Sequence, residues 1–134
     1  MKILLDTGPL VALLNQRDSH HNWSVETAAK LKPPFYSCEA VLAEAHHLLG
    51  STNQGRRQLI KLLASGKIVL SDIVRDNLLR VGELMDIYSN VPMDFADGCL
   101  TCMAENSGAT VFTLDRDFLI YRIKKNKAME LLIP

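Results

Sequence analysis

Four acidic residues that lie far apart in the chain have the types and settings that metal-dependent hydrolysis requires. Asp6 and Asp115 each follow a short apolar run of strand length, whereas Glu44 and Asp97 lie in stretches with helical spacing. Carboxylates without histidine or cysteine suit a hard cation such as Mg²⁺ or Mn²⁺. Such an ion lowers the pKa of bound water and orients a phosphodiester for in-line attack. The four acids therefore predict a phosphodiester-cleaving metal site if the fold brings them together.

Asp6 by itself fits three chemistries, because the stretch Asp6-Thr7-Gly8 follows apolar residues at the start of the chain. The same triplet introduces the catalytic carboxylate of aspartic proteases, but such a protein would consist mostly of strands and would carry the triplet deeper in the chain. A phosphatase that uses Asp6 as nucleophile commonly needs a second aspartate two residues on, where this chain has Gly8. Metal binding is the remaining chemistry.

The elements that must position these acids alternate between short strands and helices. Strands are expected at residues 2–5, 35–37, 68–70, 110–114 and 129–133, between turns marked by Pro, Gly, Ser and Asn. Apolar residues at helical spacing fill the intervening stretches. Strands that alternate with helices form parallel βαβ units. The predicted fold is therefore α/β, a three-layer α/β/α sandwich around a central parallel sheet.

In such a sheet, ligands bind beyond the carboxyl ends of the strands. If the first and fourth strands are neighbours, Asp6 and Asp115 emerge at the same edge; each acid also fits a role as a simple helix cap. Glu44 is expected on the inward stripe of a helix that begins near Ser37 as N-cap, with Leu48 on the same stripe. A position at the margin of that stripe, open to solvent, fits Glu44 equally well.

Asp94 and Asp97 stand at the start of a further helix, where Asp94 fits the N-cap. Asp97 shares a helix face with Leu100 and Ala104, so its carboxylate is expected at the same edge of the sheet as Asp6. Asp117 either caps the short helix that follows or joins the acidic site.

Composition predicts a single globular domain spanning residues 1–134, with 48% hydrophobic and 22% charged residues and a formal net charge of zero. We expect no membrane span and no secretory signal, and therefore a cytoplasmic location. Three cysteines make a poor disulfide framework, and Cys99 and Cys102 are better explained as small buried residues than as metal ligands.

Four motifs in order resemble the PIN-domain family, particularly the VapC-like toxins of bacterial and archaeal toxin–antitoxin pairs. They are "LLDTGPLVALLN", "CEAVLAEAHHLL", "MDFADGCLTCMAE" and "FTLDRDF". The resemblance implies a Rossmann-like sandwich and a Mg²⁺- or Mn²⁺-dependent ribonuclease that leaves a 5′-phosphate and a 3′-hydroxyl. It assigns the acidic quartet of catalytic and metal-binding residues to Asp6, Glu44, Asp97 and Asp115. One departure is Gly98, where many relatives carry alanine, and this change should affect packing more than chemistry.

The resemblance also suggests that Thr7 and Thr113 orient the acids as hydrogen-bond donors, that the protein forms a homodimer, and that a small antitoxin protein blocks its cleft. The leading hypothesis is endonucleolytic cleavage of single-stranded RNA. A catalytically idle PIN fold that binds RNA or protein, and a housekeeping PIN nuclease without an antitoxin, are the alternatives. A receiver-like phosphate-handling domain is disfavoured, because Asp6 has no acidic neighbour and Asp115 stands where that domain has a lysine. Basic residues near the C-terminus either guide the phosphate backbone or form an ordinary solvated face; they are Arg122, Lys124, Lys125 and Lys127.

Overall fold

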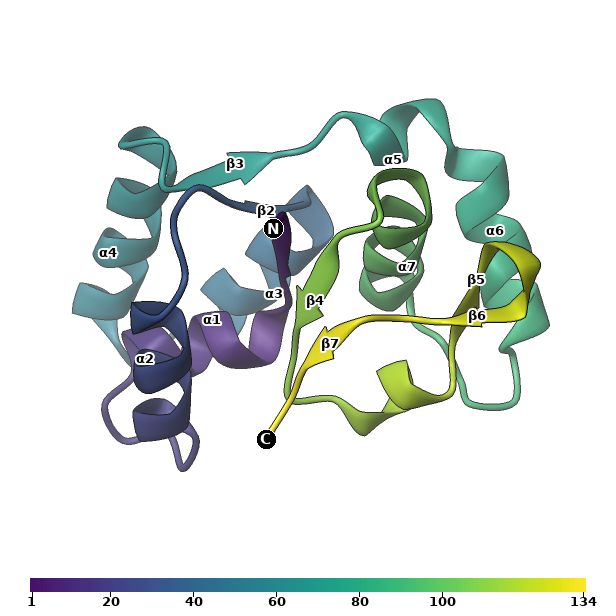
Figure 1. Ribbon diagram of the computed structural model, residues 1–134. Coiled ribbons are helices and arrows are strands. Elements are labelled where there is room, and N and C mark those ends of the chain that lie inside the picture. Colours follow the sequence, from purple (N-terminus) through teal and green to yellow (C-terminus); the bar gives the residue numbers. More distant parts are fainter.

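The computed structural model describes all residues from 1 to 134 (Figure 1). The strands are β1 (Ile3–Leu5), β2 (Phe35–Ser37), β3 (Ile68–Leu70), β4 (Thr110–Phe112), β5 (Arg122–Ile123), β6 (Lys127–Ala128) and β7 (Leu131–Leu132). The helices are α1 (Thr7–Leu14), α2 (His21–Ala29), α3 (Glu39–Leu48), α4 (Asn53–Ala64), α5 (Ile73–Asp76), α6 (Leu78–Ile87) and α7 (Phe95–Ser107), with 3₁₀ turns η1 (Arg116–Leu119) and η2 (Lys124–Asn126).

Five strands form one parallel sheet in the order β3-β2-β1-β4-β7, and β5 pairs with β6 in a separate antiparallel hairpin. Helices flank the sheet and complete a three-layer α/β/α arrangement. The predicted fold class is confirmed. The fourth strand ends at Phe112, two residues earlier than expected, and the sequence did not predict the hairpin.

The strand order reverses direction at β1. From β1 the chain proceeds to β2 and β3 on one side, and it later returns to place β4 on the other side of β1. Adjacent strands whose connections leave in opposite directions open a crevice at their carboxyl ends, where open α/β sheets bind ligands. The crevice between the ends of β1 and β4 is therefore the place that this topology favours for a site.

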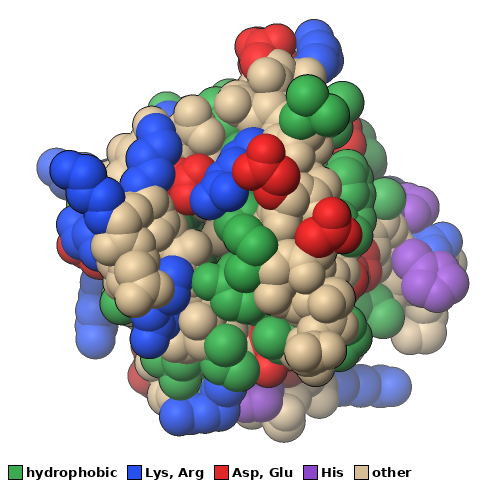
Figure 2. All heavy atoms as spheres, turned by 90° about the vertical axis from the view of Figure 1, so that its right-hand side faces the viewer, with side chains coloured by type: hydrophobic (Ala, Val, Ile, Leu, Met, Phe, Trp, Pro, Cys, Tyr) green, Lys and Arg blue, Asp and Glu red, His purple; other side chains and the backbone are tan.

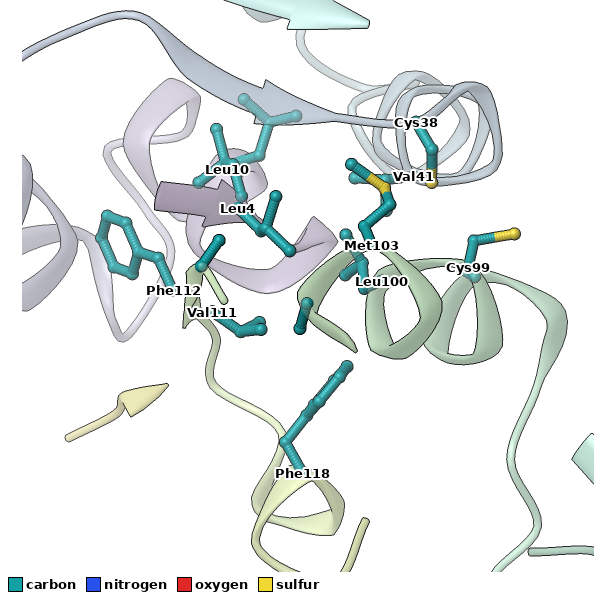
Figure 3. Close-up of a cluster of buried hydrophobic side chains, with 14 of the residues drawn as sticks. Leu4, Leu10, Cys38, Val41, Cys99, Leu100, Met103, Val111, Phe112 and Phe118 are labelled. Atoms are coloured by element: carbon teal, nitrogen blue, oxygen red, sulfur yellow. The ribbon is translucent and has the colours of Figure 1, made fainter. Parts of the chain in front are cut away.

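The core fills both faces of the sheet. Leu4 of β1 points toward Leu100 and Met103 of α7, whereas Phe112 of β4 points away from α7 (Figure 3). On that side Phe112 meets Trp23 of α2 edge-to-face, with ring centroids 5.5 Å apart. These side chains alternate between the faces as the strand pleat requires, so the strands that carry the acids are fixed from both sides.

Helix α7 packs closely against α6, and Gly98 makes this approach possible. A Cβ at position 98 would lie 3.1 Å from Met85 Cγ and 3.3 Å from Val81 Cγ1. Cys99 and Cys102 are buried free thiols, as the sequence predicted. None of the helices combines the length and the apolar character that crossing a bilayer requires.

Helix α3 begins one residue later than predicted. Its N-cap is Cys38, because Ser37 belongs to β2 and its hydroxyl donates to the carbonyl of Leu5 at 2.9 Å. Leu48 is 55% exposed, so the predicted inward stripe is wrong at this end of the helix.

Candidate active site

Asp6 connects β1 to α1, and its backbone N–H and both of its carboxylate oxygens form hydrogen bonds. Its backbone N–H donates to the carbonyl of Phe112 on the neighbouring strand at 3.0 Å. One carboxylate oxygen caps α1 by accepting from the Thr7 N–H at 2.8 Å, and the other accepts from the Thr113 hydroxyl at 2.6 Å. Asp6 is buried. The end of β1 therefore holds this carboxylate in one orientation toward the crevice.

Thr113 links Asp6 to Asp115. While its hydroxyl donates to Asp6, its oxygen accepts from the Asp115 N–H at 2.9 Å. The Asp115 side chain then accepts from the Asp117 N–H at 2.9 Å and caps η1. Both alternatives for Asp117 are therefore wrong: Asp115 is the cap, and Asp117 does not line the pocket described below.

Asp97 faces the same crevice from the first turn of α7. Asp94 caps this helix by accepting from the Asp97 N–H at 2.9 Å, as predicted. The Asp97 carboxylate is buried and accepts a hydrogen bond from the Tyr121 hydroxyl at 3.0 Å. Tyr121 itself is fully buried against Tyr88 and Phe118, so its hydroxyl is held in place.

Glu44 reaches the crevice from α3 but does so from an exposed position. The inward stripe is therefore the wrong alternative for Glu44, and the solvent-facing margin is the correct one. The other acids stand at the ends of strands or in a first helical turn, whereas Glu44 stands in mid-helix and can meet water directly.

All four predicted residues line one pocket of about 280 Å³ at the carboxyl ends of β1 and β4, which we call the acidic pocket. Its lining consists of Asp6, Thr7, Gly8, Glu44, Asp94, Asp97, Leu114 and Asp115. It contains no lysine, arginine or histidine, and none of its acids takes part in an ion pair. Asp94 also lines the pocket; the sequence left open whether it joins the site, because its role as a helix cap sufficed to explain it.

Burial and mutual repulsion disfavour the charged forms of these acids. Desolvation raises the pKa of Asp6 to about 6 against the opposing effect of the Thr113 and Thr7 hydrogen bonds. Desolvation and the neighbouring Asp94 raise the pKa of Asp97 to about 8. The pKa of Glu44 is raised by desolvation and by Asp94. Perturbed acids that face one another in a cleft mark a functional site more often than a structural one.

The donor set fits a hard divalent cation in its chemistry. Oxygen ligands and unpaired negative charge are what such an ion requires. The hydroxyl oxygen of Thr7 is also buried beside these acids and makes no hydrogen bond within the protein. As the side chains stand, no three His, Cys, Asp or Glu residues are placed to ligate one metal ion. Mg²⁺ commonly takes only one or two carboxylates and completes its coordination with water, so two of these acids suffice to hold it.

Gly8 provides a steric argument against the phosphatase chemistry. A Cβ at position 8 would lie 3.1–3.2 Å from three atoms of the Leu114 side chain. An aspartate there, as a second acid two residues after Asp6, would require the Leu114 side chain to shift by a few tenths of an ångström. The first turn of α1 therefore lies close to Leu114, which follows β4.

Comparison with known proteins identifies relatives of this architecture. The family model for the PIN domain matches residues 3–125. The fold is similar to that of VapC20 from Mycobacterium tuberculosis, a Sarcin-Ricin loop cleaving toxin, with a TM-score of 0.78 and 19% identity over 87% of this chain and 92% of that chain. It also resembles VapBC2 from Rickettsia felis, solved bound to a DNA fragment from their promoter, with a TM-score of 0.64 and 18% identity over 100% and 99% of the two chains. No curated protein sequence matches significantly.

Proposed function

The chain belongs to the PIN domain family, and on this premise we propose that it is a metal-dependent endoribonuclease that cleaves single-stranded RNA as the toxin of a toxin–antitoxin pair. The observation that carries the proposal is the convergence of five carboxylates in one pocket that contains no protein cation. Such a pocket repels a phosphodiester unless positive charge enters it. A bound divalent cation supplies that charge and activates water for attack on phosphorus.

The residues have distinct roles in this proposal. Asp6, Asp97 and Asp115 hold the cation, because each is anchored by a backbone or hydroxyl hydrogen bond that fixes its direction. Thr113 is a positioning residue, since its hydroxyl touches Asp6 and accepts from the Asp115 N–H. Glu44 is exposed, and it serves either as a further ligand or as the base that takes a proton from the attacking water.

The test compares Asp6, which lines the acidic pocket, with Asp117, which does not. Purified protein should cleave single-stranded RNA with Mg²⁺ or Mn²⁺, and chelation should stop cleavage. Asp6→Asn should abolish activity, whereas Asp117→Asn should retain it, because Asp117 lies outside the pocket. Full activity in Asp6→Asn would remove the proposal.

A second candidate is a catalytically idle PIN module that binds RNA or protein. No three acids are placed to ligate one ion as the side chains stand, whereas Mg²⁺ needs only one or two carboxylates together with water. Calorimetry with Mn²⁺ separates the two candidates. Saturable binding that Asp97→Asn weakens supports the nuclease, whereas no binding supports the idle module.

The toxin role and the partners are proposed from the same family membership. A small antitoxin that blocks the acidic pocket should be encoded by a gene next to that of this protein, and its absence would favour a housekeeping nuclease. A homodimer would cover apolar side chains that the single chain leaves open, such as Leu79 at 88% and Ile87 at 63% exposure. Light scattering of the purified protein measures this assembly directly.

A further inference from the structure

We propose that the β5–η2–β6 hairpin is an electrostatic arm that binds the phosphate backbone of single-stranded RNA beside the acidic pocket. This inference rests on the proposed function, and it names a second surface that the substrate contacts. The hairpin spans residues 122–128. The arm's cations are Arg122, Lys124, Lys125 and Lys127.

Charge is concentrated on this hairpin although the whole chain is neutral. Four of the chain's 15 lysines and arginines fall within residues 122–127, and no acid occurs between Asp117 and Glu130. None of the four forms an ion pair in the structure, whereas Arg75 and Arg80 do. Figure 2 shows Lys and Arg side chains gathered on the left of the face that includes the hairpin. The positive charges of the three lysines are therefore free to act on a partner.

Hydrogen bonds attach the base of the hairpin to the acidic pocket. Tyr121, the residue before β5, donates its hydroxyl to the Asp97 carboxylate at 3.0 Å. The Arg122 N–H donates to the Tyr88 hydroxyl at 2.7 Å. Lys124 follows Tyr121 by three residues, so the Cα atoms of the two residues are at most about 10 Å apart. An RNA strand in the pocket can reach the arm.

The Arg122 side chain serves a different purpose from the lysines. Its guanidinium donates to the carbonyls of Leu119, Ile120 and Tyr121 at 2.9–3.3 Å, which closes the turn that begins at Asp115. Arg122 therefore ties the arm to the segment that carries a pocket acid. Its replacement would disturb both, so the lysines are the residues to test.

The turn holds Lys125 in a backbone conformation that a lysine rarely adopts. Its φ is 60°, and that of the next residue, Asn126, is 58°. Glycine adopts this left-handed region without strain, whereas a residue with a Cβ does so only at a cost. Lys125 therefore places a charge at the tip of a tight turn, at a position where glycine would adopt the backbone conformation with less strain.

The physical need for such an arm follows from the pocket itself. Five carboxylates without a protein cation repel a polyanion at the place where it must react. A divalent cation bound in the pocket offsets part of this repulsion, and cations outside the pocket add attraction through contacts with phosphates that do not depend on base sequence. An unpaired, anchored basic hairpin next to the pocket provides this attraction.

The test measures how salt weakens RNA binding. Asp6→Asn serves as the background so that RNA stays intact, and fluorescence anisotropy follows a labelled single-stranded RNA across ~50–200 mM salt. The hairpin variant adds Lys124→Gln, Lys125→Gln and Lys127→Gln. The matched control adds Lys30→Gln, Lys32→Gln and Lys67→Gln, which change the charge equally at exposed positions that precede β2 and β3, away from the acidic edge.

For single strands the slope of log K against log salt changes by about 0.7 for each phosphate contact. The hairpin variant should therefore lose about 2 from this slope and bind at least about tenfold more weakly at low salt, whereas the control should keep the slope of the background. Equal slopes in the hairpin variant and the control would overturn the inference. Cleavage by the unsubstituted chain, measured in parallel, tells whether the nuclease proposal fails separately.

Lys125→Gly gives a second test that does not depend on three simultaneous changes. Glycine suits the φ of 60°, so the turn keeps its shape while one charge disappears. The salt slope should decrease by about 0.7 and the melting temperature should not fall. An unchanged slope with an unchanged melting temperature would count against the arm.

Discussion

Two hollows lie at opposite ends of α1, and they differ in both size and chemistry. At the N-terminal end of the helix is the acidic pocket of about 280 Å³. At the C-terminal end is a cavity of about 630 Å³, which we call the polar cavity; it is lined by Leu13, Leu14, Asn15, Gln16, Arg17, His21, Ser51, Thr52, Gln54, Gly55 and Gln58. The polar cavity is more than twice as large but contains no carboxylate.

The comparison shows that convergent charge marks the candidate site better than volume does. The polar cavity is lined mainly by neutral amides and hydroxyls, with Arg17 and His21, and it brings no like charges together. In the acidic pocket, burial disfavours the ionised forms of Asp6 and Asp97, and the ends of two strands and a helix keep these acids together. Proteins retain such an arrangement where function requires it.

The largest expected difference between the two hollows is in activity. Asp97→Asn should lower the rate of RNA cleavage by about 100-fold or more, because it removes a charge that holds the cation. The same change should raise the melting temperature of the metal-free protein, because a buried carboxylate beside Asp94 is gone. Cleavage assays and thermal melts on one preparation measure both effects. A variant that is less active and also less stable without metal would contradict the role we assign to Asp97.

The second largest difference should be in the pH dependence of the free energy of unfolding, to which the acids of the acidic pocket contribute. The pKa of Asp6 is about 6 and that of Asp97 about 8, both above the ordinary value of 3.8. The folded protein therefore binds protons that the unfolded chain releases, and stability falls as pH rises from about 4 toward 8. Asp6 alone accounts for about 3 kcal/mol of this loss at most.

Urea unfolding at a series of pH values, without metal, measures this slope. The double variant Asp6→Asn and Asp97→Asn is the reference, because it keeps the four histidines that also titrate in this range. Saturating Mn²⁺ should flatten the slope of the unsubstituted protein, since the bound ion favours the ionised acids. A slope that is the same in the double variant would show that the pocket acids do not cause it.

Thr113→Val should have an intermediate effect on the acidic pocket. The substitution removes the hydroxyl that donates to Asp6 and accepts from the Asp115 N–H, which should cost about 2 kcal/mol of unfolding free energy. Because this hydrogen bond lowers the pKa of Asp6, its loss raises that pKa further, and the pH at which activity rises should move upward. A pH–rate profile of Thr113→Val against Thr113→Ser checks this, since serine restores the hydroxyl.

The smallest effects are expected in the polar cavity. Gln54→Ala and Gln58→Ala should change stability by less than about 0.5 kcal/mol and cleavage by less than about twofold, because neither side chain forms a hydrogen bond in the structure. A large loss of cleavage in either variant would mean that RNA also binds at this end of α1. The acidic pocket would then not be the only one of the two that serves cleavage.

Much of this architecture could be predicted from local sequence. Strands β2 and β3 lie where they were expected, and Asp94 caps α7 as predicted. These features depend on neighbouring residues alone. The β5–β6 hairpin was missed because its strands are two residues long and its turn contains neither glycine nor proline.

The amino-acid sequence alone determined the alternation of strands and helices and the acids that stand at their ends, because periodicity and capping are local properties. Only the tertiary structure decided that β4 lies beside β1, that Glu44 reaches the pocket from an exposed margin, and that Asp94 faces the same space. Burial, and with it the raised pKa of Asp97, arises when distant segments exclude water together, which no single stretch of the chain can do.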